Sequence, residues 1–307
     1  MIPRLFLFRA GPHLSKTAKI CRRCGLEHRQ ALAIESGSKP ISATIMRLQD
    51  QVILITGSTT GIGEFMARRF VAEGAKVILH GRDAARGEAL SKELGSDNAA
   101  FCQGSLEDPA YPEKLAAGAI AAFGKVDALV NNAALTSRGR ITETDAAFFD
   151  RMMAVNARAP MLLIRALLPE LKKNQGVVLN IGSVLAHCGQ ANMLAYSMSK
   201  GALMTMTRNL ADSLGMDRVR VNQLNVGWTL SDNEYQVKLG DGLGEGWPER
   251  LPPQVVPMGR LLMPTDIAAA CVYWVGRESF PVTGTVAELE QYPIIGRYTN
   301  AEGDDKK

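Results

Sequence analysis

Tyr196 and Lys200 stand four positions apart in a stretch whose residue types suit proton transfer. The apolar residues after them recur at helical spacing, so both are predicted to lie on one face of a long helix. A phenol with a pKa near ~10 is a poor acid or base at neutral pH, but a cation beside it favours the phenolate. An exposed helix can carry such a pair by chance, with a solvated lysine beside a half-buried tyrosine. Two further signals favour a proton donor: Ser183 at the end of a strand-like run and a glycine turn after an earlier one.

The glycine turn has a spacing that suits a phosphate group. Gly57, Gly61 and Gly63 form a Gly-x-x-x-Gly-x-Gly sequence between a predicted strand and a predicted helix. Glycine lets the backbone approach a pyrophosphate closely, and the free N–H groups at the helix start hold the anion. An ordinary strand-to-helix turn would seldom need three glycines, so the spacing favours a nucleotide-binding turn.

The elements that must position these residues alternate regularly. Strands are predicted at 52–56, 76–80, 99–103, 126–131, 176–182, 218–224 and 285–289. Helices are predicted at 64–73, 83–94, 109–123, 145–173, from Ala195 onward, and at 265–275, with an irregular stretch between 224 and about 264. Such alternation predicts an α/β fold with a single Rossmann-like, doubly wound parallel sheet and helices on both faces. Ligands bind beyond the carboxyl ends of such strands, where Gly57, Asn131, Ser183 and Gly227 are expected.

Composition narrows the class of protein. The chain has 307 residues, of which 46% are hydrophobic, and no apolar run approaches the ~20 residues that cross a bilayer. The net charge of +4 is concentrated in the first 45 residues, so nothing in the body reads as a nucleic-acid surface. Five cysteines without regular spacing indicate a reducing compartment. We therefore expect a cytoplasmic protein that binds neither nucleic acid nor membranes.

Residues 1–46 differ from the rest and are predicted to be a basic, disordered leader. Their Arg-containing, acid-poor composition fits either an organelle transit peptide or a misassigned start, because Met46 stands just before the first strand. Cys21 and Cys24 have a zinc-like spacing, but no second pair follows, so no metal site is predicted. The functional domain is expected to cover residues 47–307.

The motifs together resemble the short-chain dehydrogenases/reductases. The matching residues, in sequence order over about 48–289, are Thr56-Gly57-x-x-x-Gly61-Ile62-Gly63, Asn131-Asn132-Ala133, Asn156, Ser183 and Tyr196-x-x-x-Lys200. The resemblance implies hydride transfer between a nicotinamide cofactor and a carbonyl/alcohol pair of a small-molecule substrate. It also implies a homodimer or homotetramer, with the helices around Tyr196 and Thr265 as candidate interfaces.

The resemblance implies roles for particular residues. Tyr196 would be the general acid/base, and Lys200 would lower its pKa and bind the nicotinamide ribose. Ser183 would hold the substrate oxygen, and Asn156 would interrupt helical bonding and support a proton-carrying water. The cofactor would contact Gly57, Ser58, Thr60, Gly61, Ile62, Gly63, Arg82, Asn132, Ala133, Tyr196, Lys200, Gly227 and Thr229.

Cofactor choice can be argued from the end of the second strand. NAD enzymes of this family place a carboxylate there, whereas this chain has Gly81 followed by Arg82. A guanidinium favours a 2′-phosphate, so NADP(H) is predicted, with NAD(H) as the alternative. Asp83 is expected to cap the next helix rather than to bind ribose.

Some positions depart from the family pattern. Ala134 replaces the last glycine of Asn-Asn-Ala-Gly, Ser105 replaces an aspartate beside the adenine, and Val226 replaces the proline before Gly227. The common Val-Asp-Gly-Gly tail is replaced by residues 288–293. Residues 228–257 are predicted to form a substrate lid, made mobile by its glycines.

Other functions are open at this stage. A non-catalytic nucleotide sensor or scaffold would tend to lose the tyrosine or the lysine, and both are present here. An epimerase or dehydratase of the same family usually carries a different glycine spacing and a longer C-terminal domain. The substrate itself is not predicted: sugar, polyol, steroid, acyl thioester and pterin carbonyls all fit.

Overall fold

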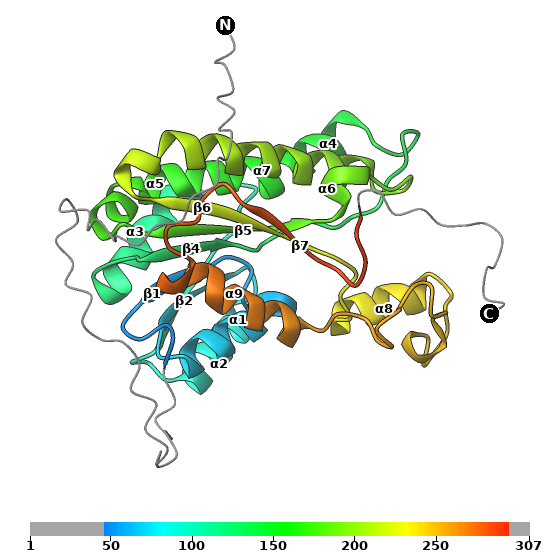
Figure 1. The fold of residues 1–307 in the computed structure, drawn as a ribbon, viewed down its shortest axis with the longest axis horizontal. Helices are drawn as coiled ribbons and strands as arrows, with labels where there is room; N and C mark the ends of the chain where they lie inside the picture. The colour runs from blue at the N-terminus through cyan, green and yellow to red at the C-terminus, as the bar shows by residue number, and fades with distance from the viewer. Residues whose placement is uncertain (1–45, 295–307) are drawn as a thin grey trace, which may run out of the picture. The chain divides into compact units, whose positions relative to one another are not determined.

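One parallel sheet organises the fold of residues 46–294, which are the residues that the computed structural model describes. Its strand order is β3-β2-β1-β4-β5-β6-β7, and every neighbouring pair is parallel (Figure 1). The strands are β1 (Val52–Ile55), β2 (Lys76–Gly81), β3 (Ala99–Gln103), β4 (Ala128–Asn131), β5 (Val177–Ser183), β6 (Arg220–Val226) and β7 (Val286–Leu289). The predicted leader, its possible targeting role and the Cys21–Cys24 pair lie outside the described residues.

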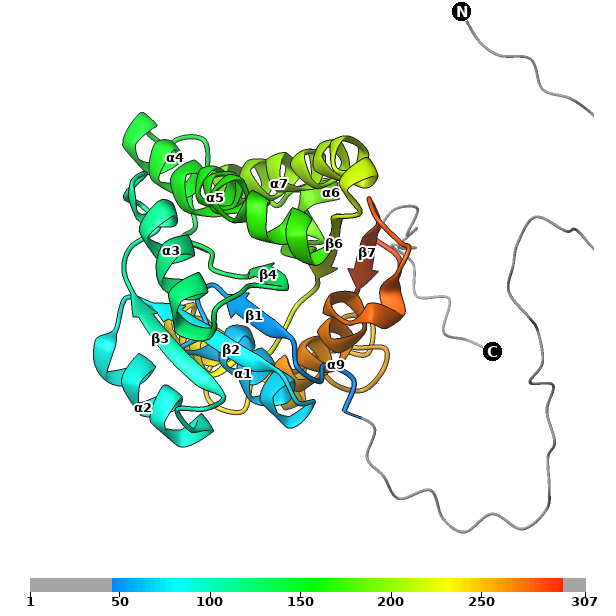
Figure 2. The same ribbon diagram turned by 90° about the vertical axis from the view of Figure 1, so that its left-hand side faces the viewer.

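Helices cover both faces of the sheet. On one face lie α1 (Gly61–Ala72), α2 (Ala84–Leu94) and α9 (Pro264–Val275), as Figures 1 and 2 show. The other face carries α3 (Tyr111–Phe123), α4 (Ala146–Met153), α5 (Ala159–Asn174) and α7 (Leu194–Ser213). The predicted doubly wound α/β fold is therefore confirmed.

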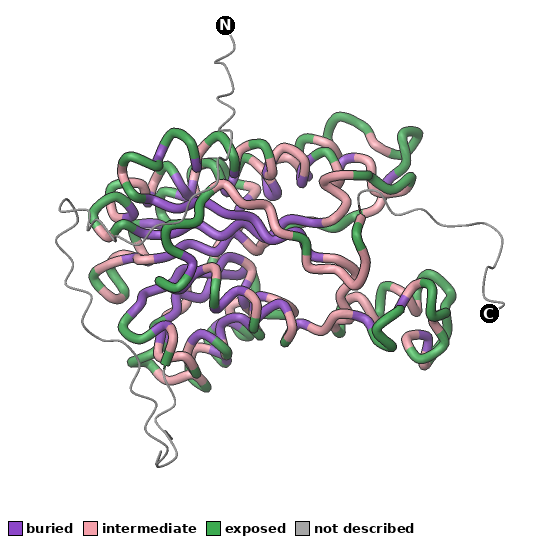
Figure 3. Tube along the Cα trace, viewed as in Figure 1, coloured by how far each residue is buried: buried purple, intermediate pink, exposed green. Residues whose placement is uncertain are grey.

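Burial on both faces of the sheet explains why strands such as β1 consist of consecutive apolar residues. All four residues of β1 are buried, with Ile53 and Ile55 in the core under α1 and α9. Val52 and Leu54 point the opposite way, into the core under α3, α5 and α7. Since side chains alternate across a strand, a strand covered on both faces needs apolar residues at every position. Figure 3 shows this buried centre in purple.

Two segments differ from the sequence prediction. The helix expected at 145–173 is divided into α4 and α5 by a π-helical turn, Ala154–Arg158, which includes Asn156. The stretch expected to be irregular contains α8 (Asp232–Gly240), whose start is capped by the Ser231 side chain. None of the residues of α8 is buried, so it lacks the apolar stripe by which a sequence reveals a helix.

The lid, defined here as residues 229–262, has its own small core. Trp247 is 2% exposed and stacks on Trp228 and Tyr235, with ring centroids 5.5 and 6.0 Å apart. Its two ends meet where Leu230 N–H donates to the Leu262 carbonyl at 2.7 Å. The lid, which carries α8 at its start, therefore has hydrophobic packing of its own.

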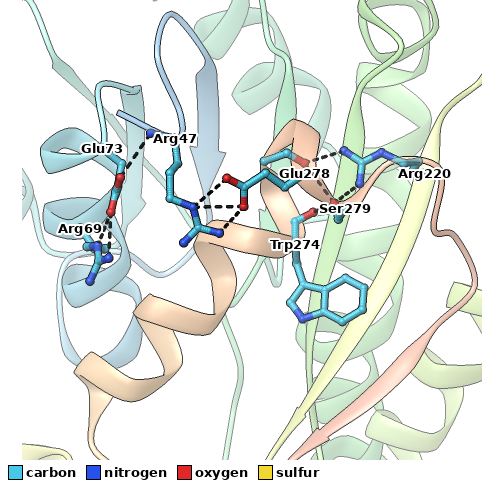
Figure 4. A network of polar contacts seen from close by, with 8 residues as sticks. Arg47, Arg69, Glu73, Arg220, Trp274, Glu278 and Ser279 are labelled. Carbon is cyan, nitrogen blue, oxygen red and sulfur yellow. Dashed lines mark hydrogen bonds and ion pairs between the residues drawn. The ribbon is translucent and has the colours of Figure 1, made fainter. Parts of the chain in front are cut away.

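Polar contacts join the first described residues to α1 and the segment after α9 (Figure 4). Arg47 donates through Nε to Glu278 at 3.0 Å, and its backbone N–H donates to Glu73 at 3.3 Å. Arg220, which is buried at the start of β6, donates to the Gly276 carbonyl at 3.1 Å and to the Ser279 hydroxyl. These contacts stabilise the amino ends of the strands and leave the carboxyl ends free for a site.

Candidate active site

A cleft of about 1010 Å³ lies at the carboxyl ends of the strands. It is lined at one end by the glycine turn and the end of β2, in the middle by the ends of β4, β5 and β6, and at the other end by the lid. Among the predicted site residues, the lining includes Gly57, Thr60, Gly61, Ile62, Arg82, Asn132, Ala133, Ser183, Tyr196, Lys200, Gly227 and Thr229.

The glycine turn is tightly packed behind and open in front. A Cβ on Gly63 would come within 2.2 Å of the Gly57 carbonyl oxygen, and one on Gly57 within 2.8 Å of the Ala133 backbone. Gly57 and Gly61 also have φ angles of 62° and 55°, in the left-handed region that favours glycine. A Cβ on Gly61 would meet nothing within 4 Å, because that position faces the cleft. The turn therefore leaves room at the start of α1 for a bound group.

Ser58 and His80 hold the turn from below. The Gly57 N–H donates to Nδ1 of His80 at 3.2 Å, and the Ser58 N–H donates to the His80 carbonyl at 2.9 Å. The Ser58 hydroxyl donates to the Ile55 carbonyl at 2.8 Å and is fully buried. Ser58 is therefore absent from the lining of the cleft, and its contact with a cofactor stays a prediction.

His80 is a structural residue that the sequence analysis did not single out. It is 3% exposed, and burial lowers the pKa of its imidazole to about 4. Only a neutral ring can leave Nδ1 unprotonated, and the tautomer with its proton on Nε2 is the one that can accept the Gly57 N–H. The conformation of the turn thus depends on an uncharged histidine.

Asn132 and Thr56 connect the glycine turn to the end of β4. The Asn132 side-chain amide donates to the carbonyls of Thr56 and Gly57 at 2.9 and 3.0 Å. In return, the Thr56 hydroxyl oxygen accepts the N–H groups of Asn132 and Ala133, both at 3.0 Å. Asn132 lines the cleft and also braces the turn.

At the far end of the cleft, Arg82 and Thr59 follow the ends of β2 and β1. Arg82 is exposed and lines the cleft, while its carbonyl accepts from the side chain of Gln103 at 3.1 Å. A Cβ on Gly81 would come within 2.7 Å of the Thr59 side-chain oxygen, so no larger residue fits there without displacing it. Asp83 caps α2 by accepting from the Arg86 N–H, as predicted.

Ser183, Tyr196 and Lys200 line one wall of the cleft. Ser183 ends β5, and its Oγ accepts the Leu185 N–H at 3.2 Å, which leaves the hydroxyl hydrogen for another acceptor. Tyr196 and Lys200 lie one turn apart in α7, with Nζ of Lys200 5.7 Å from the centroid of the phenol ring. The three residues that the sequence analysis put first are therefore together.

The electrostatics of this wall differ from the expectation. Burial raises the pKa of Tyr196, the neighbouring Ser183 hydroxyl lowers it in part, and the charge of Glu234 raises it further. Burial also lowers the pKa of Lys200 to about 8. Burial is the largest of the effects on Tyr196, so its pKa is raised overall and Tyr196 is a protonated phenol at neutral pH.

Asn156 lies behind the cleft rather than in its lining. Its side chain is 1% exposed, accepts the Leu135 N–H at 2.8 Å, and donates to the Leu135 carbonyl at 2.9 Å and to Ser199 at 3.0 Å. The predicted interruption of helical bonding is confirmed by the π-helical turn, a feature that is frequent at functional sites. In this structure Asn156 positions the loop after β4 against α7.

A chain of buried polar side chains supports the site from inside the sheet. Asn131 donates to Asn180 at 2.8 Å, and Asn180 donates to Thr207 at 2.8 Å. Thr207 lies 3.0 Å from Gln223, whose amide donates to Asn225 at 2.7 Å. Such groups are stable inside a core because each has a hydrogen-bonding partner.

Glu290, in the segment 288–293 that departs from the family pattern, contacts the loop after β6. Glu290 accepts the Trp228 N–H at 3.0 Å and the Gln291 N–H at 2.7 Å. A Cβ on Gly227 would come within 1.9 Å of a Glu290 oxygen. The Glu290 carboxylate therefore fixes the loop that is less rigid without the family's proline.

An ion pair joins the lid to the loop after β4 at one end of the cleft. Arg138, in the loop after β4, bonds to Asp241 at the end of α8, and Lys238 lies 3.2 Å from the same carboxylate. Trp228 donates through Nε1 to Glu234 at 2.8 Å. The sequence analysis missed Arg138, Glu234 and Asp241, because lone charged residues in a polar segment carry no recognisable spacing.

The comparisons with known proteins agree on one family. A model of the short chain dehydrogenase family matches residues 51–240. The L-fucose dehydrogenase of Mus musculus is 32% identical over 241 residues, which cover 78% of this chain and 86% of that protein. The NADP-dependent (R)-specific alcohol dehydrogenase of Lentilactobacillus kefiri is 33% identical over 260 residues, covering 82% of this chain and 98% of that protein.

A solved structure gives the same result. The 3-ketoacyl-(acyl-carrier-protein) reductase from Brucella melitensis, complexed with NADH, has a TM-score of 0.70 and 31% identity to this chain. It matches 79% of this chain and 97% of the reductase. Across residues 46–294, no helix is both long and apolar enough to cross a membrane.

Proposed function

Because the chain belongs to the short-chain dehydrogenase family, we propose that it is an NADP(H)-dependent oxidoreductase that interconverts a carbonyl and an alcohol. The observation that carries this proposal is the shared wall of Ser183, Tyr196 and Lys200 in a cleft that also holds the glycine turn. One molecule spanning the cleft would contact the anion-binding turn and the acid–base residues together.

The cleft fits a dinucleotide. Gly61 faces open space at the start of α1, where backbone N–H groups and the helix dipole favour a pyrophosphate. Gly227 and Thr229 lie at the other side, where they would hold the nicotinamide end. The N–H and hydroxyl of Ser58 bond within the protein, so in this set Ser58 would support the turn from inside. When bound, the cofactor supplies or accepts the hydride.

The residues of the chain supply the proton and orient the substrate. In carbonyl reduction, the Ser183 hydroxyl would donate to the carbonyl oxygen and hold it beside Tyr196. The Tyr196 hydroxyl would then give its proton to that oxygen as the alcohol forms. The Lys200 ammonium would stabilise the phenolate left behind. In alcohol oxidation, the same residues act in reverse, and the phenolate takes the proton.

The raised pKa of Tyr196 bears on the pH at which each direction of the reaction would run. A raised pKa keeps the proton on the phenol at neutral pH, where reduction needs it. Oxidation needs the phenolate and should require alkaline conditions.

Arg82 supports NADP(H) over NAD(H). A guanidinium beside the end of β2 matches a 2′-phosphate in charge and geometry. No carboxylate follows β2 in the lining there to bind free ribose hydroxyls, and the L. kefiri relative is named as NADP-dependent.

Homo-oligomer formation is proposed as well. Met161 on α5, Met198 on α7 and Tyr273 on α9 are 45%, 51% and 38% exposed. Apolar side chains on these outer helices support the candidate interfaces, and light scattering of the purified protein would give the number of subunits.

The proposed activity is tested by NADPH oxidation against a panel of ketones, ketoses and aldehydes. Tyr196→Phe should lower kcat by about a hundredfold or more, because it removes the proton donor. The Kd for NADPH should stay within about twofold of the wild-type value, since a missing hydroxyl leaves the turn intact. Tyr273→Phe, on the exposed side of α9, is the matched control. NADPH binding without turnover of any carbonyl would instead indicate a sensor.

A further inference from the structure

Glu234 faces the substrate end of the cleft from the first turn of α8. Its Oε1 accepts the Trp228 indole N–H at 2.8 Å, which fixes the direction of the carboxylate. Within residues 46–294, its second oxygen accepts no hydrogen bond. The side chain is thus anchored at one oxygen and open at the other.

The other carboxylates that line the cleft are already engaged. Asp241 bonds to Arg138 and Lys238, and Glu290 accepts two backbone N–H groups. Glu107 lies 3.1 Å from Arg151. Among the carboxylates of the described lining, Glu234 is therefore the one that has no cation partner and still keeps an oxygen for a ligand.

Glu234 is also close to the reacting centre. Its charge acts on the Tyr196 phenol across the cleft. Trp228, which anchors it, directly follows Gly227 at the end of β6. A substrate that lies along the cleft with its oxygen against Tyr196 and Ser183 would extend toward Glu234, which lines the same cleft.

From this geometry we infer that Glu234 binds a hydroxyl group of the substrate, so that the enzyme acts on hydroxylated ketones and their polyols. This inference rests on the proposed function. An apolar ketone would bury the carboxylate against carbon with no donor, which is costly. A hydroxyl next to the carbonyl would supply that donor and would fix which face of the ketone meets the cofactor.

A hydroxyl fits better than an ammonium group. Lys200 lines the same cleft beside Tyr196, so its ammonium would repel a cationic group of a bound substrate. A neutral hydroxyl donates to Glu234 without that repulsion. Ser231, Asn233 and Gln190 add uncharged polar groups at this end, which suit further hydroxyls. The L-fucose dehydrogenase named among the relatives is, by its name, a sugar enzyme.

Three probes with the same number of non-hydrogen atoms test the inference: hydroxyacetone, 2-butanone and aminoacetone. They place OH, CH3 or NH3+ next to the same methyl ketone. Wild-type enzyme should give the highest kcat/KM with hydroxyacetone. In Glu234→Gln, the ratio of kcat/KM for hydroxyacetone to that for 2-butanone should fall about tenfold, because a charge-assisted hydrogen bond becomes a neutral one.

Glu249→Gln is the matched control, because Glu249 is an exposed lid carboxylate outside the cleft lining. In Glu249→Gln, the ratio of kcat/KM for hydroxyacetone to that for 2-butanone should equal the wild-type ratio. An unchanged ratio in an active Glu234→Gln enzyme would overturn the inference alone, as would a preference for 2-butanone or aminoacetone. Failure of the whole carbonyl panel would overturn the proposed function instead.

A second measurement does not depend on the probe. The rate of alcohol oxidation should rise with pH as the Tyr196 phenolate forms. In Glu234→Gln this rise should occur at lower pH, because the variant removes a charge that opposes the phenolate. A rise that stays at the wild-type pH would show that Glu234 does not face the phenol, and the inference would fail.

Discussion

The Lys200 ammonium donates a 2.8 Å hydrogen bond to the carbonyl oxygen of Ile181, two residues before Ser183 in β5. Strand β5 therefore carries the serine and also orients the lysine of α7. Both Lys200 and Ile181 are buried, so the ammonium has lost most of its contact with water and gained one hydrogen bond to a backbone carbonyl. This exchange is the physical reason for the lowered pKa of Lys200.

The first prediction concerns the pH dependence of reduction. Lys200 is charged below a pKa of about 8 and loses its proton as the pH rises through that value. Reductive kcat/KM should therefore be level through neutral pH and fall above about 8, since the phenolate loses its stabilising cation. In Lys200→Arg, any remaining activity should keep its level to higher pH, because a guanidinium stays charged. If kcat/KM fell at the same pH in both enzymes, the fall would have to be assigned to a group other than Lys200.

The second prediction concerns the cofactor. Arg82→Ala should raise the KM for NADPH about tenfold and change the KM for NADH less than about twofold, because only NADPH offers a phosphate to the guanidinium. Arg86→Ala, on the exposed face of α2, is the control for loss of one positive charge. Equal effects of the Arg82 variant on both cofactors would contradict a 2′-phosphate contact.

The third prediction concerns the closure of the lid. The Arg138–Asp241 pair is about one-third exposed, so its loss should hardly change the free energy of unfolding. Arg138→Gln should nevertheless raise KM several-fold, because it removes the ionic contact between the lid and the loop after β4. In wild type, KM should rise with salt, since ions screen exposed pairs, and in the variant it should not. Arg140→Gln serves as the neighbouring control. Identical salt dependence of KM in wild type and Arg138→Gln would contradict a role of the Arg138–Asp241 pair in closing the lid.

The fourth prediction concerns His80 and acid stability. The imidazole has a pKa of about 4 in the fold and ~6.5 when unfolded, so the unfolded chain binds more protons between these values. Its stabilising contribution is complete above pH ~6.5 and decreases as the pH falls, by about 3 kcal/mol at pH 4.

Urea unfolding of wild type and His80→Asn between pH 4.5 and 7 would measure this contribution. Asparagine does not titrate, and its side-chain oxygen can still accept from the Gly57 N–H. The difference in unfolding free energy between the two proteins should therefore shrink or reverse toward low pH. Parallel curves would mean that His80 does not titrate differently in the two states.

The architecture could be predicted because each of its signals is local. Apolar runs such as 52–55, glycine stops and the Asp83 cap are all read from neighbouring residues, and the structure has these elements close to the expected bounds. The division of the helix at 154–158 could not be read from periodicity, since five residues are too few to show a period of their own. Only the asparagine there indicated the interruption.

The site was predictable where its residues belong to spaced motifs, and not elsewhere. Ser183, Tyr196 and Lys200 are brought together as expected. The pKa of Tyr196 was expected to fall and instead rises, because burial depends on packing that the sequence does not state. The roles of Ser58 and His80 depend on which way two neighbouring side chains point. Glu290 bonds to Trp228, which is distant in the chain. Glu234 lies in α8, which has no buried face and therefore no recognisable pattern in the sequence.

The joined ends of the lid have a consequence for how this fold can change. Residues 229 and 262 touch, so everything between them leaves the sheet and returns to it at a single point. An insertion or deletion there leaves the course of β6 and α9 unaltered, while it replaces the wall that a substrate meets. Ser183, Tyr196 and Lys200 thus lie on β5 and α7, while the lid is a separate segment that a designer could graft between family members at those two positions.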